Sequence, residues 1–269
     1  LHECMAEHGG FEHNLQSLRV VDTLEERYPQ FDGLNLSFET REGILKHCSR
    51  TNAEAIEAQE PGGVARRFID RTQPSLEAQL CNLADAIAYN AHDIDDGVRS
   101  GLITLEQLEN VSIFARNRRI VEQRYPGLAG RRLIHETIRR MINLMAVDLI
   151  EQTRNNIDEA GVGSLDDVRA APRLVAYSAE LLPELRVLKT FLRDNLYHHY
   201  QVLRMTDKAR RIIQDLFAAF MNDPRLLPPQ YLQMTKVDKP RAIADYIAGM
   251  TDRYAMKEHR RLYAVGEIY

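Results

Sequence analysis

The sequence predicts an all-α protein folded as a compact multi-helix bundle. Apolar residues recur at intervals of three and four along most of the chain, which is the period of an amphipathic helix. No convincing run of alternating apolar and polar residues indicates a strand. The connections between the helical stretches are short, so we expect one domain over residues 1–269.

The first predicted elements have recognisable boundaries. Residues 12–28 carry leucine and valine at helical spacing, and Pro29 with the FDGLN turn ends that helix. Ser37 is a suitable N-cap for a second helix over residues 37–47. Residues 49–63, which end in PGG, are expected to form a loop.

The remaining elements follow the same pattern. Ser75 caps a predicted helix over residues 75–93, and residues 104–125 contain one or two further helices. A long amphipathic helix is predicted over residues 131–158, followed by a capped turn, SLDDVRAAP. The last helices are predicted near residues 179–198, 204–222 and 239–264, with the sharpest break at NDPRLLPPQY.

Composition excludes some classes of protein. The chain is 44% apolar and 28% charged with a net charge of −4, so it carries no overall basic signal for nucleic acid. No apolar run approaches the roughly 20 residues that span a bilayer, so we expect no membrane partner. Three widely spaced cysteines fit buried thiols in a reducing, cytoplasmic protein. Recurring arginine pairs are typical of solvated helix faces. The alternative is that these pairs bind a nucleotide effector or single-stranded DNA.

The N-terminus has an unusual start. The chain begins at Leu1 and continues into LHECMAEHGG, which is typical of the last turns of a helix. There is no signal-peptide pattern. We therefore expect the sequence to begin inside a longer protein.

The strongest candidate site is an acidic strip on the helix predicted over residues 75–93. Asp85, Tyr89 and Asp93 are four residues apart, so they stack along one helix face beside apolar side chains. Two carboxylates and a phenol in a row can hold a metal ion and a polar ligand. The alternative is a helix end with solvated acids, because Gly97 closely follows Asp93.

Three further segments carry candidate residues. In GGFEHN, His13 falls in the first turn of a helix, where free N–H groups favour an anion; an ordinary surface histidine is the alternative. Lys46 is predicted near a helix C-terminus, where it could contact a phosphate or simply complement the helix dipole. In NLYHHY, Tyr197 and its neighbours could form an aromatic wall for a ligand or a plain helix end.

Together these segments resemble the bacterial deoxyguanosinetriphosphate triphosphohydrolase family of the HD-domain superfamily. The resemblance lies in GGFEHNLQSLRVV, ERYPQFDGLNLSFETREGILKH, LADAIAYNAHDIDDG, FLRDNLYHH and RAIADYIAGMTDRYAMKEHRRL, which occur in the family's order over nearly the whole chain. It implies an HD-domain-like helical fold and hydrolysis of a deoxynucleoside triphosphate (dNTP) to deoxynucleoside and triphosphate. It also implies a divalent metal, Mg²⁺ or Mn²⁺.

The resemblance assigns roles to individual residues. It makes Asp85 the last metal ligand of the family's H…HD…D pattern and His13 a catalytic residue near the phosphates. It places Tyr89 and Asp93 in the nucleotide pocket, with Asp93 near the sugar 3′-hydroxyl. It places Tyr197 beside the deoxyribose, where a 2′-hydroxyl would clash, and Lys46 at a phosphate.

The sequence departs from the family pattern at the metal site. The family's first His and its His-Asp pair precede the segment that begins this chain, so only Asp85 of four expected ligands is present. One carboxylate does not hold a divalent ion well, so residues 1–269 alone are expected to bind no catalytic metal tightly and to be inactive. The implied protein is a homo-oligomer. The alternatives are a non-catalytic nucleotide-binding or assembly subunit and an HD phosphohydrolase acting on another nucleotide.

Overall fold

The computed structural model describes residues 1–266 and is all-α, as the sequence predicts. The described residues form no β-strand and only two isolated bridges, Glu26–Gly33 and Tyr28–Phe31. None of their helices is long and apolar enough to cross a membrane. The chain divides into two compact units, so the single domain expected over residues 1–269 stays a prediction.

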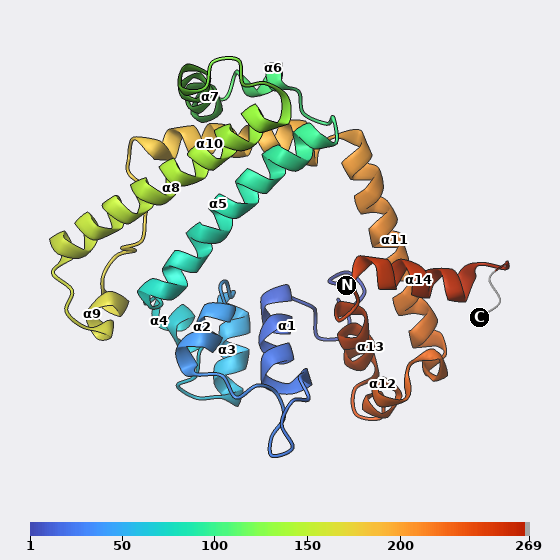
Figure 1. The fold of residues 1–269 in the computed structure, drawn as a ribbon. Helices are drawn as coiled ribbons and strands as arrows, with labels where there is room; N and C mark the ends of the chain where they lie inside the picture. The colour runs from blue at the N-terminus through green and yellow to red at the C-terminus, as the bar shows by residue number, and fades with distance from the viewer. Residues whose placement is uncertain (267–269) are drawn as a thin grey trace. The chain divides into compact units, whose positions relative to one another are not determined.

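The central unit comprises residues Ser37–Val202. Its core contains Ile94 of α5, Phe114 of α7, Met141 of α8 and Leu188 of α10, all almost fully buried. Helix α8 packs against α5 and α7, and α10 packs against the same two helices (Figure 1). The unit's helices are α2 (Phe38–Ile44), α3 (Arg50–Gln59), α4 (Arg66–Asp70), α5 (Leu76–Arg99), α6 (Leu105–Leu108), α7 (Ser112–Arg124), α8 (Gly130–Ala160), α9 (Leu165–Ala170) and α10 (Leu181–Leu192).

The terminal unit comprises residues Leu1–Leu36 and the chain from Leu203 onward. Its core contains Met5, Phe220 and Ile243, and a buried carboxylate, Asp245, that accepts hydrogen bonds from Arg19 at 2.9–3.1 Å. The unit's helices are α1 (His13–Arg19), α12 (Pro229–Met234), α13 (Lys239–Ala248) and α14 (Asp252–Tyr263), together with most of α11 (Tyr200–Asn222).

The structure corrects the prediction of a loop over residues 49–63. Residues Arg50–Gln59 form α3, and the Ser49 hydroxyl caps it by accepting from the Asn52 backbone N–H at 3.2 Å. The helix buries only Ala53, so its sequence has no apolar stripe to reveal it. Of residues 49–63, the PGG segment and the two capping residues, Ser49 and Glu60, lie outside the helix.

Two predicted helices have different lengths in the structure. The helix predicted over residues 12–28 ends at Leu24 in a π-helical turn, and Gly33 packs so closely on the Asp22 backbone that a Cβ would lie 2.4 Å from it. The helix predicted over residues 239–264 is two helices, because the Thr251 hydroxyl caps a new one by accepting from Tyr254 N–H at 3.3 Å.

The cysteines are less buried than expected. Cys81 is exposed, and Cys4 and Cys48 are only partly buried. Cys81 lies on α5, whose buried face is formed by other residues, so the prediction of buried thiols was wrong for this position.

Candidate functional site

Helix α5 carries the predicted strip of Asp85, Tyr89 and Asp93. It begins at Leu76, where the Ser75 hydroxyl accepts from the Ala78 backbone N–H, and ends at Arg99. The alternative of a helix end near Asp93 was wrong, because Gly97 lies within the helix. A Cβ at Gly97 would lie 2.5 Å from Ile103, so the glycine permits close packing and does not end the helix.

Exposure falls along the strip. The Asp85 side chain is 73% exposed, and Tyr89 is 56% exposed. Asp93 is only partly exposed, one residue before the fully buried Ile94. The strip therefore borders the core of the central unit at its Asp93 end, whereas its Asp85 end is open to solvent.

Lys46 and Asp85 form an ion pair at the exposed end of the strip. Lys46 Nζ lies 3.5 Å from Asp85 Oδ2. Helix α2 ends at Ile44 with Leu45 as its C-cap, so Lys46 follows the helix in the chain. A surface pair of this kind contributes at most about 1 kcal/mol to stability, so both side chains remain available to a ligand.

Tyr197, Asp93 and Tyr89 form a cluster at the other end. The Tyr197 hydroxyl donates a hydrogen bond to Asp93 Oδ2, and the Tyr197 and Tyr89 ring centroids lie 6.0 Å apart. Tyr197 ends the π-helical turn Arg193–Tyr197 that continues α10. The structure thus brings Tyr197, predicted in a separate segment, beside two residues of the α5 strip.

Burial sets the protonation behaviour of this cluster. It raises the pKa of the Asp93 carboxyl, while the hydrogen bond from Tyr197 opposes that rise. It also raises the pKa of Tyr197, and hydrogen bonds with Asp93 and Tyr89 raise it further. Tyr197 is therefore a hydrogen-bond donor at neutral pH.

His13 lies in the terminal unit and has a different environment from that predicted. It is in the first turn of α1, but the Glu12 carboxylate caps the helix by accepting from the backbone N–H groups of Asn14 and Leu15 at 2.9 and 3.0 Å. The expectation of free N–H groups for an anion is wrong for these two donors. The His13 side chain is 82% exposed, and its Nδ1 lies 2.8 Å from Glu12 Oε1.

The residues present do not make a metal centre. Among residues 1–266, no three His, Cys, Asp or Glu side chains are grouped so that they could hold an ion. Asp85 supplies one carboxylate, and its neighbour at 3.5 Å is a cation. A divalent ion needs several oxygen or nitrogen ligands, so Asp85 and its described surroundings do not fit one.

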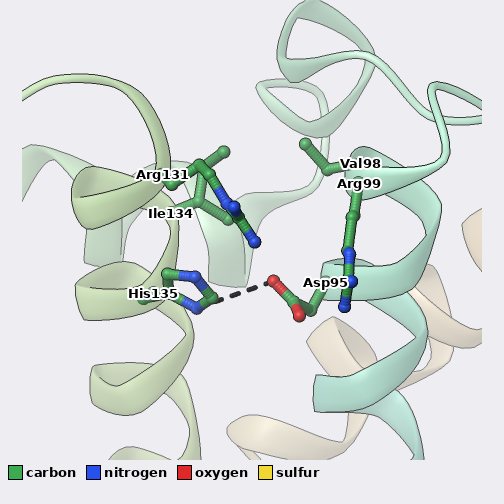
Figure 2. A pocket seen from close by; sticks show the side chains of 6 residues that line it. All are labelled: Asp95, Val98, Arg99, Arg131, Ile134 and His135. Atoms are coloured by element: carbon green, nitrogen blue, oxygen red, sulfur yellow. Dashed lines mark ion pairs between the residues drawn. The ribbon is translucent and has the colours of Figure 1, made fainter.

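A cavity between α5 and α8 brings together residues that the sequence did not indicate. Asp95 and Arg99 of α5 and His135 and Arg131 of α8 line it from its two sides (Figure 2). Its volume is about 300 Å³. His135 Nδ1 lies 3.6 Å from Asp95 Oδ1. An adjoining, mostly apolar cavity of about 420 Å³ continues between the same helices. No sequence signal pairs positions 95 and 135, because only the packing of α8 on α5 joins them.

Comparison with known proteins defines the class of this protein. Residues 175–261 match the phosphohydrolase-associated domain family. The class is therefore a helical protein that carries a phosphohydrolase-associated domain.

Similarity over the whole chain defines the particular family. The chain is 71% identical to a deoxyguanosinetriphosphate triphosphohydrolase-like protein of Azoarcus sp. (strain BH72), over 100% of this chain and 70% of that protein. It is 66% identical to the protein of that name from Ralstonia nicotianae, over 98% of this chain and 67% of the relative. It is 62% identical to the protein of that name from Thiobacillus denitrificans, over 100% of this chain and 70% of the relative. The chain belongs to the deoxyguanosinetriphosphate triphosphohydrolase-like family.

Proposed function

We propose that this protein is a metal-dependent dNTP triphosphohydrolase whose nucleotide pocket is formed along α5. The reaction adds one water across the bond between the 5′ oxygen and the α-phosphorus, giving deoxynucleoside and triphosphate. Asp85 contributes one metal ligand, and Lys46 and His13 interact with phosphates. Tyr89, Asp93 and Tyr197 bind the nucleoside. The protein is a cytoplasmic homo-oligomer in this proposal.

The observation that carries the proposal is the hydrogen bond from Tyr197 to Asp93. It holds the tyrosine ring beside the carboxylate and beside the Tyr89 ring. Among the described residues Asp93 Oδ1 accepts no hydrogen bond, so this oxygen can accept one from a sugar 3′-hydroxyl. A ring fixed next to that carboxylate suits contact with the C2′ face of a deoxyribose and leaves little room for a 2′-hydroxyl.

Selectivity for the sugar tests the proposal. In the complete protein that carries residues 1–269, we expect release of triphosphate from at least one dNTP in Mn²⁺ or Mg²⁺. The kcat/KM ratio of dGTP to GTP should fall about tenfold in Tyr197→Ala, because the space for a 2′-hydroxyl opens. Tyr200→Ala is the matched control, since Tyr200 is 60% exposed and lies three residues away in the same segment.

Two results would contradict the proposal. Unchanged dGTP/GTP selectivity in Tyr197→Ala removes Tyr197 from the pocket. Binding of dNTPs without release of triphosphate from any of them identifies the protein as a non-catalytic nucleotide-binding subunit.

A further inference from the structure

Another pocket of the central unit has four cationic side chains in its lining, and we call it the arginine pocket. Its volume is about 290 Å³, and the four cations are Lys46, Arg67, Arg71 and Arg173. His47 also lines it. No aspartate or glutamate is among the residues that line it. Four side chains that are charged at neutral pH thus face one small space.

The nearby carboxylates neutralise these charges only in part, because Arg67 and Lys46 have acidic partners and the other two arginines do not. Glu42 is fully buried and is bound at both oxygens by Arg169, at 2.7 and 3.1 Å, while Arg67 Nε lies 3.6 Å from it. Asp85 pairs with Lys46 alone. Within residues 1–266, the side chains of Arg71 and Arg173 make no hydrogen bond and no ion pair. The pocket therefore keeps a net positive charge.

Arg67 is held rigidly in this pocket. Its side chain is 10% exposed, its NH2 group donates to the Leu45 carbonyl at 3.0 Å, and its guanidinium lies 3.8 Å from the centre of the Phe68 ring. Its buried Nε makes no hydrogen bond among the described residues. A guanidinium that is already fixed loses little entropy when it binds an anion.

Arg71 occupies a backbone position that favours glycine. It is the C-cap of α4, with a φ of 60° in the left-handed region. A non-glycine residue there costs on the order of 1 kcal/mol. Glycine would fit this backbone better, so the arginine is not explained by the stability of the turn.

We propose that the arginine pocket binds a small polyphosphate anion. Guanidinium groups pair with phosphate oxygens two at a time, and several negative charges are needed to match four cations. The volume lies at the lower limit of small-molecule pockets, roughly 300 Å³, so it accommodates a phosphate chain without a nucleoside. The anion is either free polyphosphate or the phosphate chain of a nucleotide. The proposal shares Lys46 with the proposed function but requires no hydrolysis.

Calorimetric titration of the protein with tripolyphosphate, in EDTA and at low ionic strength, tests this site. We expect one anion bound per chain, with affinity about tenfold weaker in Arg71→Gly and in Arg173→Gln, since each loses one charge-assisted contact. Arg71→Gly suits the local backbone, so a loss of binding in this variant is not a loss of folding. Arg119→Gln, which removes the same charge from an exposed position on α7, should change affinity less than twofold.

Titrations with dGTP and deoxyguanosine distinguish the two sources of phosphate. Tripolyphosphate that binds at least as tightly as dGTP indicates a site for free polyphosphate. Tighter binding of dGTP, weakened by the same two substitutions, indicates the phosphate chain of a nucleotide. Affinities that are equal in Arg71→Gly, Arg173→Gln and the parent protein would overturn the proposal, as would millimolar binding of both anions. Because EDTA prevents turnover, an inactive protein leaves this test unaffected.

Discussion

Two aspartates of α5, eight residues apart on one helix face, have opposite surroundings. Asp85 is 73% exposed and lies 3.5 Å from the Lys46 ammonium. Asp93 is partly buried, and a tyrosine hydroxyl is its hydrogen-bond donor. The same residue type on the same face is therefore an exposed carboxyl beside a lysine at one end and a partly buried carboxyl with a raised pKa at the other.

This difference shows how one helix can serve two purposes. An exposed carboxylate with a weak surface partner can exchange that partner for another ligand at little cost. A partly buried carboxylate that is already hydrogen-bonded is fixed in place and suits the recognition of a neutral hydroxyl group. We therefore expect substitutions at Asp85 to affect activity and not stability, and substitutions around Asp93 to affect both.

The largest expected effect follows from Asp85→Ala. This change should lower triphosphate release by about 100-fold or more, because it removes the carboxylate proposed as a metal ligand. The thermal midpoint of the variant should stay within about 3 °C of that of the parent protein, since a surface ion pair contributes at most about 1 kcal/mol. Assays of release and thermal unfolding, with Asp158→Ala on α8 as an exposed control, measure both quantities. Activity in Asp85→Ala equal to that of the control would refute the role of Asp85.

A smaller effect is expected from Tyr197→Phe. This variant keeps the ring beside Tyr89 but removes the donor to Asp93, so the free energy of unfolding should fall by about 1 kcal/mol. The hydrogen bond from Tyr197 lowers the pKa of Asp93, so that pKa should rise further in the variant. Urea unfolding and NMR titration of the Asp93 carboxyl measure these changes. Tyr200→Phe is the control, and a lower Asp93 pKa in Tyr197→Phe would contradict the assignment.

The sequence predicted the helices that have an apolar stripe. The α5 cap at Ser75 and the long α8 were expected, because burial of one face imposes the helical period. One or two helices were expected where α6 and α7 lie. The polar α3 was missed because it buries only Ala53, and its one signal was the capping residue Ser49. Position-specific caps thus carried information that the hydrophobic pattern lacked.

Spacing predicted that Asp85, Tyr89 and Asp93 share a face, but it could not predict their exposure. The partners Lys46 and Tyr197 come from 39 residues before Asp85 and 104 residues after Asp93, so only tertiary packing identifies the contacts. Resemblance to the family selected these residues as candidates without giving their geometry. The assigned roles of the six site residues, including His13 in the terminal unit, stay predictions.

The smallest effect is expected from Asp93→Asn, which should raise the stability of the protein and lower its affinity for dGTP. A carboxyl whose pKa is raised on folding destabilises the folded state when it is charged. That penalty is absent below its ordinary pKa of 3.8 and is complete above the raised value. Asparagine still accepts the hydrogen bond from Tyr197 but carries no charge. Asp93→Asn should therefore be more stable than the parent at pH 7.5, by less than about 1 kcal/mol because solvent screens this partly exposed group.

The pH dependence of this difference makes the prediction specific. The advantage of Asp93→Asn should shrink as the pH falls from 7.5 to 4, since the carboxyl of the folded parent becomes protonated as the pH passes its raised pKa. Affinity for dGTP should fall in the same variant, because the neutral amide is a weaker acceptor for the sugar hydroxyl. Urea unfolding at the two pH values, with calorimetry of dGTP binding, measures both. A variant less stable than the parent at pH 7.5 would contradict the inference that the charged form of Asp93 is penalised in the folded protein.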